Sequence, residues 1–173
     1  MIDSKGFTLV ELLIATSIIG VGLMGAFTAV QQGISAMDYS NSRFVAAFLA
    51  QEGVEVIKSM RDTNLLQSTT WNDGFSFNGD YELQYTDAHS LSPILFSVIC
   101  SPDCFNDLHF LTKTNNGFYD YGPSSETKFK RKIRIENLPP DKIELEITVY
   151  WRKTGGGTHK LILKQHVYNW LNS

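Results

Sequence analysis

The 173-residue sequence has little net charge, no proline in its first half and no catalytic motif. Its 15 lysine and arginine residues nearly balance its 18 aspartate and glutamate residues, so the net charge of −3 gives no reason to expect a nucleic-acid partner. The first of five prolines is Pro93, and no proline interrupts a helix before that point. The sequence contains no Ser/His/Asp order, zinc-protease motif or phosphate-binding loop. We therefore expect no enzymatic activity and no cofactor.

Charge is also missing from residues 7–30, where Glu11 is the single charged side chain. As a helix these 24 residues would be about 36 Å long, enough to cross the ~30 Å hydrocarbon core of a bilayer. The run is too long for an ordinary secretory signal, and the small residue Gly6 precedes it instead of following it. Lys5 favours a cytoplasmic amino terminus, although Asp3 weakens this bias. We expect a membrane-spanning helix and a water-soluble, extracytoplasmic head.

Glu11 has two interpretations. A carboxylate near the amino end of a membrane helix is tolerated, because it can reach the interface and is favoured by the helix dipole. Alternatively, it has a partner: cleavage between Gly6 and Phe7 would create an amino group at Phe7. That cation could pair with Glu11 within one helix or between helices.

The segment GFTLVELLIA, residues 6–15, resembles the amino-terminal signature of type IV prepilins and type II secretion pseudopilins. In that family, a membrane-embedded prepilin peptidase cuts after the glycine and methylates the new amino terminus. The resemblance implies a leader of residues 1–6, cleavage between Gly6 and Phe7, and N-methylation of Phe7. It also implies that Glu11 neutralises the amino terminus of a neighbouring subunit during assembly.

The resemblance implies a structural subunit of a type IV pilus or a type II secretion pseudopilus. Its partners would be other pilin-like subunits, the prepilin peptidase, an inner-membrane assembly platform and membrane lipid. Residues 46–64 are similar to a recurring stretch of minor pilins and minor pseudopilins, which favours a minor subunit. The subunit would start in the inner membrane as a single-pass protein and then enter the filament. The alternatives are a membrane-anchored binding module, with Glu11 incidental, and an anchored enzyme.

The long helix is expected to continue beyond the membrane. Residues 31–62 read as an amphipathic continuation, with one face marked by Val45, Leu49, Gly53, Val56 and Met60, and with Phe44, Phe48 and Ile57 beside it. In the membrane segment, Gly20, Gly22 and Gly25 fit G-x-G-x-x-G, but no strand precedes them, so they do not predict a dinucleotide site. The resemblance implies that a segment of this helix unwinds on assembly, and because glycine weakens a helix we expect residues 20–25 to be that soft point. A small-residue stripe suited to close helix packing accompanies them: Gly22, Ala26, Ala29 and Gly33.

Residues 63–173 predict a β-rich head. Asn78-Gly79 indicates a hairpin within residues 71–87, residues 94–100 a short strand, and residues 109–121 a second hairpin about Asn115-Asn116-Gly117. Apolar residues alternate with polar ones in three later segments, around Ile133, Ile147 and Leu163. The expected fold is α+β, with a long amino-terminal helix packed on an antiparallel sheet that has one covered face.

The head offers a few candidate sites. Cys100 and Cys104 are the only cysteines, and we expect them to form a disulfide outside the cytoplasm. A zinc site using His109 competes, but it lacks a fourth ligand because His89 is distant in sequence. Oxygen ligands for calcium would come from Asp107, Asn115, Asn116 and Asp120, but their spacing fits no regular calcium loop and turns explain them more simply.

One basic cluster comprises Lys128, Lys130, Arg131, Lys132 and Arg134. A nucleic-acid patch is one interpretation, but aromatic residues for base stacking are few. We favour the solvated face of a strand, with lysines that discourage edge pairing.

Overall fold

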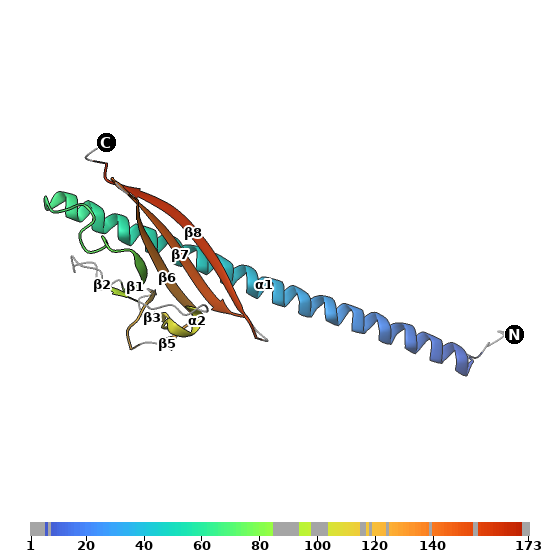
Figure 1. The fold of residues 1–173 in the computed structure, drawn as a ribbon. Helices are drawn as coiled ribbons and strands as arrows, with labels where there is room; N and C mark the ends of the chain where they lie inside the picture. Colours follow the sequence, from blue (N-terminus) through green and yellow to red (C-terminus); the bar gives the residue numbers. More distant parts are fainter. Residues whose placement is uncertain are drawn as a thin grey trace. The chain divides into compact units, whose positions relative to one another are not determined.

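The computed structural model describes residues 6, 8–84, 94–97, 104–114, 117, 119–123, 125–138, 140–153 and 156–170. Within these residues the chain forms one long helix, one helical turn and eight strands, and Figure 1 shows how they are arranged. The helices are α1 (Leu9–Leu66) and α2 (Cys104–Asp107). The strands are β1 (Gly79–Gln84), β2 (Ile94–Ser97), β3 (Thr112–Lys113), β4 (Tyr119–Asp120), β5 (Ser125–Glu126), β6 (Phe129–Leu138), β7 (Lys142–Arg152) and β8 (Thr158–Tyr168). The α+β prediction is confirmed.

The chain divides into two compact units, Met1–Asn41 and Ser42–Ser173. The described part of the first unit is almost entirely α1, and none of its described residues is buried. The second unit contains the rest of α1 and both sheets. All of the buried core residues that the structure describes belong to this second unit.

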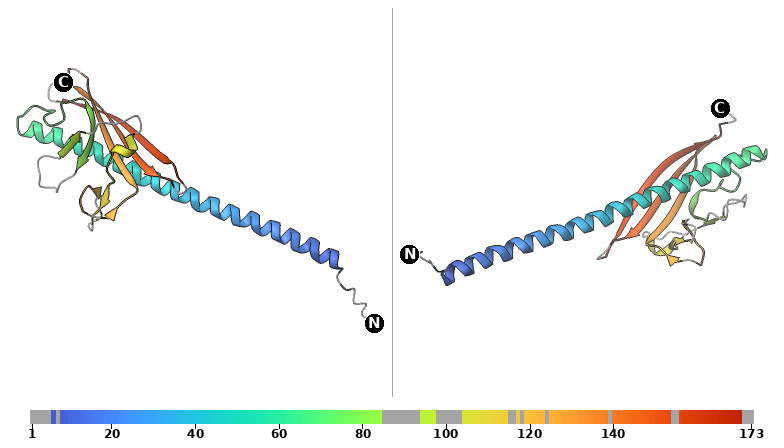
Figure 2. Two further views of the ribbon diagram at one scale, coloured as in Figure 1. Left: turned by 60° about the horizontal axis from the view of Figure 1, so that its bottom comes forward. Right: turned by 180° about the vertical axis from the view of Figure 1, so that it is seen from behind.

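The main sheet has five antiparallel strands in the order β2-β1-β6-β7-β8. The carboxyl-terminal part of α1 runs along one face of this sheet (Figure 2). The alternation predicted for the last three strands is confirmed: Ile133 in β6 and Ile147 in β7 are fully buried in the core, and in β8 Leu161 and Leu163 are half-buried against it while their neighbours are exposed. Between β7 and β8, Gly156 and Gly157 adopt positive φ, as a tight turn requires.

The buried face of α1 is shifted from the predicted one. Leu49, Gly53 and Ile57 are buried as expected, but Val45 and Met60 are only partly buried. Phe44 and Phe48 are exposed, with their rings edge to face at 4.7 Å between centroids. Small residues at this contact let the helix approach the sheet closely: Ser42, Ala46, Ala50 and Gly53.

The predicted hairpin about Asn78-Gly79 is wrong. Gly79 begins β1, which pairs with β6 on one side and β2 on the other, so residues 71–78 form no partner strand. The Asn78 side chain instead accepts a hydrogen bond from the backbone N–H of Asn137 at 2.8 Å. Asn78 therefore forms a polar contact with β6, and Asn78-Gly79 is not the turn of a hairpin.

The second predicted hairpin is confirmed. Strands β3 and β4 pair antiparallel, Gly117 lies in the turn with positive φ, and β5 adds a third strand on the other side of β3. Asn115 and Asn116 lie outside the described residues.

Candidate functional site

The amino-terminal segment joins an exposed peptide to the start of a helix. Gly6 is exposed and non-helical, and α1 begins only at Leu9. Phe7 lies outside the described residues. The first turn closes where the N–H of Leu12 donates to the carbonyl oxygen of Thr8 at 3.2 Å. Gly6 therefore precedes the hydrogen-bonded helix, and cleavage after it stays a prediction.

Thr8 caps this helix, which the sequence analysis missed. The backbone N–H of Glu11 donates to Thr8 Oγ1 at 3.3 Å, which satisfies one of the unpaired donors of the first turn. Thr8 and Glu11 fit the T-x-x-E pattern of a capping box, which was visible in the sequence. A carboxylate at the position of Glu11, in the first turn, is favoured by the positive end of the helix dipole.

The remaining polar side chains of the apolar run bond to their own helix. Thr16 Oγ1 donates to the carbonyl of Leu12 at 3.0 Å, and Ser17 Oγ donates to that of Leu13 at 2.7 Å. Thr28 Oγ1 donates in the same way to Gly25 at 2.9 Å. Hydroxyls paired in this way can enter lipid without an unsatisfied donor.

Within the described residues, α1 is the one helix that is long and apolar enough to cross a membrane, with a window of mean hydropathy 2.0. Gly20, Gly22 and Gly25 all lie inside its continuous helical segment. A Cβ atom built on any of the three would meet nothing within 4 Å. Packing within the chain therefore gives no reason for these glycines, and their role as a soft point stays a prediction.

The basic cluster is not the solvated face of a strand, so that interpretation is wrong. Its strand, β6, lies inside the sheet between β1 and β7, and Lys130, Arg131 and Lys132 are buried. Residues 104–110, which include α2, cover Lys130. Its Nζ donates to the carbonyls of Phe105 at 2.8 Å and Leu108 at 2.5 Å, and lies 4.2 Å from the ring centroid of Phe110. Burial lowers the pKa of Lys130, and these three cations cannot form an exposed nucleic-acid patch.

Arg131 lies on the opposite face of the sheet and is fully buried. Its Nη1 donates to the carbonyl of Leu49 in α1 and its Nη2 to that of Leu83 in β1, both at 3.1 Å. Nη1 also lies 3.4 Å from a carboxylate oxygen of Glu52. One side chain thereby ties the helix to two strands. The backbone carbonyl of Arg131 accepts from Tyr121, whose pKa is raised by burial.

Asp80 joins two further cations of the cluster. Arg134 donates to both carboxylate oxygens of Asp80, at 2.8 and 2.9 Å, and Lys132 Nζ lies 3.5 Å away. The Arg134 guanidinium, with Lys132 beside it, holds the pKa of Asp80 below its usual range despite burial. The same bond raises the pKa of Arg134.

The metal-site candidates that the structure describes are engaged in other contacts. His109 uses both its backbone N–H and Nδ1 to contact the buried carboxylate of Glu82, at 2.6 and 2.8 Å. Asp120 accepts from the backbone N–H of Tyr121 at 2.7 Å, as a turn residue does. Among the described residues, no group of three His, Cys, Asp or Glu side chains could hold a metal ion.

The cysteines are described only in part. Cys104 begins α2, and no described cysteine is a free thiol. Lys132 Nζ lies 3.8 Å from Cys104 Sγ. Cys100 lies outside the described residues, so the Cys100–Cys104 disulfide stays a prediction.

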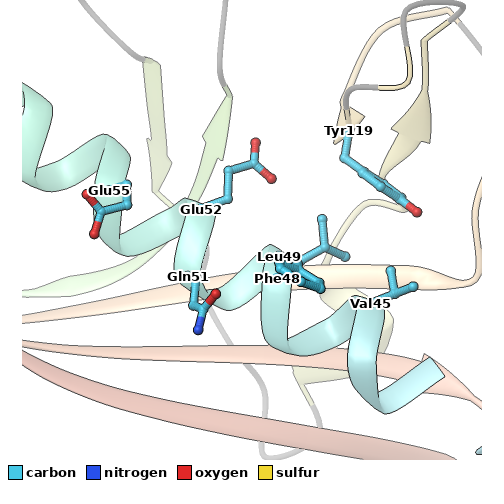
Figure 3. Close-up of a pocket in the computed structure, with 7 residues that line it drawn as sticks. All are labelled: Val45, Phe48, Leu49, Gln51, Glu52, Glu55 and Tyr119. Atoms are coloured by element: carbon cyan, nitrogen blue, oxygen red, sulfur yellow. The ribbon is translucent and has the colours of Figure 1, made fainter. Parts of the chain in front are cut away.

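The head also carries an open groove of about 430 Å³ beside α1. Figure 3 shows Tyr119 on one side and Val45 and Leu49 on the other, with Glu52 above them. Phe48, Gln51 and Glu55 complete the lining. The walls are largely apolar, and the carboxylate of Glu55 is bound by Lys58 at 3.0 Å.

Residues 1–27 match the family described as the prokaryotic N-terminal methylation motif. No curated protein matches the chain. No solved structure matches it either. The chain thus carries the amino-terminal signature of type IV pilins and pseudopilins, with a hydrophobic helix suited to membrane anchoring, and this signature supports a pilin-like structural role.

Proposed function

We propose that this chain is a minor structural subunit of a type IV pilus or a type II secretion pseudopilus. Prepilin peptidase cuts after Gly6 and methylates Phe7, and the subunit then assembles through α1. Before assembly it is a single-pass protein of the inner membrane, with a cytoplasmic amino terminus and an extracytoplasmic head. Its partners are other pilin-like subunits, the peptidase, the assembly platform and lipid.

The observation that carries the proposal is the methylation motif, together with one carboxylate in an otherwise uncharged helix. Burying a carboxylate at the bilayer centre costs roughly 2.5–3.5 kcal/mol, and Glu11, nearer the rim, costs less; an amine partner would offset that cost. In a filament, the methylated amino group of an incoming Phe7 supplies that partner for Glu11. The similarity of residues 46–64 to minor subunits supports the minor role.

The first experiment is mass spectrometry of the mature amino terminus, in cells that contain a prepilin peptidase. The proposal expects a chain that begins at methylated Phe7. An intact Met1 would instead favour the alternative function, a single-pass anchored binding module.

Substitutions of Glu11 separate its assembly role from its capping role. Gln is accepted at the third position of a capping box but carries no charge. Glu11→Gln and Glu11→Ala should therefore both insert into the membrane and both fail to enter filaments. If Glu11→Gln assembles normally while Glu11→Ala does not, the carboxylate acts as a cap and the charge pairing is rejected.

The soft point is tested by hydrogen exchange. In assembled filaments, the amides of residues 20–25 should exchange faster than those of flanking turns, because glycine weakens the helix. A variant with Gly20, Gly22 and Gly25 changed to alanine should lose this difference. Slow exchange across this segment in the parent filament would contradict the proposal.

A further inference from the structure

The last strand of the chain, β8, forms one edge of the main sheet (Figure 1). It pairs with β7 along all 11 of its residues, Thr158–Tyr168, without a bulge in the register. No described strand lies on its other side. The strand also contains no proline or glycine, the residues that commonly limit pairing at a sheet edge. The outer side of β8 is therefore a long row of backbone donors and acceptors.

The register shows which residues of β8 face this free side. At the two ends of the β7–β8 ladder, Lys153 donates a backbone hydrogen bond to Gly157 and Asn169 donates one to Asp141. Hydrogen-bonded and non-hydrogen-bonded pairs alternate along an antiparallel ladder, so the odd-numbered residues of β8 bond to β7. The N–H and carbonyl groups of the even-numbered residues therefore point away from β7.

The carboxyl-terminal end of this free side is already occupied. The carbonyl of His166 accepts a hydrogen bond from Gln165 Nε2 at 3.1 Å, and the carbonyl of Tyr168 accepts one from Arg61 Nη1 at 3.5 Å. The remaining even-numbered residues of β8 form what we call the open edge: Thr158, Lys160, Ile162 and Lys164.

The side chains of β8 favour a partner of negative charge. The strand contains two lysines and two histidines but no aspartate or glutamate. Lys164 is bound by Glu144 and Glu146 of β7, at 3.3 and 2.9 Å. Lys160 is exposed and forms no ion pair with the described residues. A carboxylate placed opposite Lys160 on an added strand would therefore meet an unpaired cation.

The two faces of β8 determine the side-chain pattern of such a strand. Leu161 and Leu163 lie on the core side and are only half-buried. Apolar residues opposite these leucines would extend the core, whereas the residues opposite Lys160 and Lys164 would lie on the outer face. The matching strand thus alternates apolar residues with polar and acidic ones.

We propose that the open edge binds an extended acidic segment of another protein, which adds to the main sheet as a further strand. Backbone hydrogen bonds supply the affinity, and the alternating side chains supply the specificity. A second copy of β8 matches less well, because two such strands bring together only cations. In the antiparallel register centred on Ile162, Lys160 of each copy would face Lys164 of the other. The inference concerns the head alone and does not depend on trimming or filament assembly.

A synthetic peptide with the matching pattern tests the proposal. The probe is a fluorescent, end-blocked peptide of the sequence Val-Glu-Val-Thr-Val-Glu-Val, which reads the same in both strand directions. It is titrated into the full chain in detergent and followed by fluorescence anisotropy. Saturable binding is expected. A peptide with both glutamates changed to lysine should bind at least about fivefold more weakly, and a peptide with N-methylated backbone amides should not bind.

Two substitutions of the chain locate the binding site. Ile162→Pro removes an N–H that faces the free side, so it should leave the β7–β8 ladder intact and weaken peptide binding at least about fivefold. Lys160→Glu should weaken binding by about the same factor through like-charge repulsion. Lys113→Glu, at an exposed position of β3, is the matched control and should change binding less than about twofold. Circular dichroism of each variant checks that the head remains folded.

Amide hydrogen exchange, measured by NMR, provides a second readout. Bound peptide should slow the exchange of the Lys160, Ile162 and Lys164 amides at least about tenfold. The amides of Leu161 and Leu163, which already bond to β7, should change little. The proposal would be overturned by the absence of saturable binding, by equal binding of the N-methylated peptide, or by protection confined to other parts of the head. Pairing of two copies through β8 in place of peptide binding would overturn it as well.

Discussion

Two buried cationic side chains of the head, Lys130 and Arg131, hydrogen-bond to the backbone of elements that lie on the two faces of the sheet. Lys130 holds the segment of residues 104–110 through two backbone carbonyls, and Arg131 holds α1 and β1 from the opposite face. Buried cations are tolerated when hydrogen bonds satisfy their protons. The Nε of Arg131 is a buried donor without a hydrogen-bond partner, so even this well-connected side chain is not fully satisfied.

Removal of Arg131 should destabilise the head strongly. Arg131→Ala leaves a cavity and removes the hydrogen bonds to the carbonyls of Leu49 and Leu83, and we expect the free energy of unfolding to fall by about 3–5 kcal/mol. Arg131→Met fills much of the same volume and should lose only about 1–2 kcal/mol. Urea unfolding of the full chain in detergent, followed by tryptophan fluorescence, measures both values. Equal losses in the two variants would show that the hydrogen bonds, and not the volume, carry the effect.

Asp80 should make the head sensitive to acid. Its folded-state pKa is lowered, chiefly by Arg134, so its contribution is fully present above the unfolded pKa of ~3.9 and is lost as pH falls through the lower folded value. Because the side chain of Arg134 is half exposed, we expect Asp80→Asn to cost only about 1 kcal/mol at pH 7.

This cost should shrink as pH falls below the unfolded pKa and through the lower folded pKa, because the parent carboxyl then becomes protonated as well. Urea unfolding at pH 7, 4 and 2 gives the profile. Asp73→Asn, at an exposed position, is the control and should change little at any pH. A cost for Asp80→Asn that is the same at all three values would mean that the ion pair is not its source.

At the scale of elements, the sequence correctly predicted the strands and turns whose structure is determined by residues close together in the chain. The strands around Ile133, Ile147 and Leu163 and the turn at Gly117 were predicted because alternation and turn chemistry are local. The basic cluster was misread because its cover, residues 104–110, is distant in sequence, and alternating lysines look solvated without it. Asn78-Gly79 was misread for a similar reason, since its partner is Asn137. The cap by Thr8 was predictable from T-x-x-E and was overlooked.

Gly53 shows how closely α1 approaches the sheet. A Cβ built there would lie 3.4 Å from the Cδ1 atoms of Ile133 and Ile147, which is ordinary contact. Gly53→Ala should therefore be accommodated and gain up to about 1 kcal/mol from better helix propensity. Gly53→Val is larger and should lose about 1–3 kcal/mol by overpacking. Thermal unfolding of the full chain in detergent should rank the proteins Ala, Gly, Val. A loss of stability in Gly53→Ala would mean that the two isoleucines cannot shift at all.

At the scale of the whole molecule, one unit is suited to membrane anchoring and the other contains the folded core. The Met1–Asn41 unit exposes its large apolar side chains and contributes no described residue to the buried core. The Ser42–Ser173 unit contains the core, and its part of α1 supplies one side of that core. The stability of the head should therefore depend on α1 only from Ser42 onwards.

A chain shortened to begin at Gln31 tests this division. It loses the apolar run but keeps every described buried residue, so it should be soluble without detergent and unfold cooperatively. Its free energy of unfolding should lie within about 1 kcal/mol of that of the full chain in detergent, because no core contact is removed. A chain that begins at Ala50 is the matched control, since it also lacks Ala46 and Leu49 and should lose its near-ultraviolet circular dichroism. If the Gln31 chain is equally disordered, the first unit contributes to the folding of the head, and the separation of anchor from head is wrong.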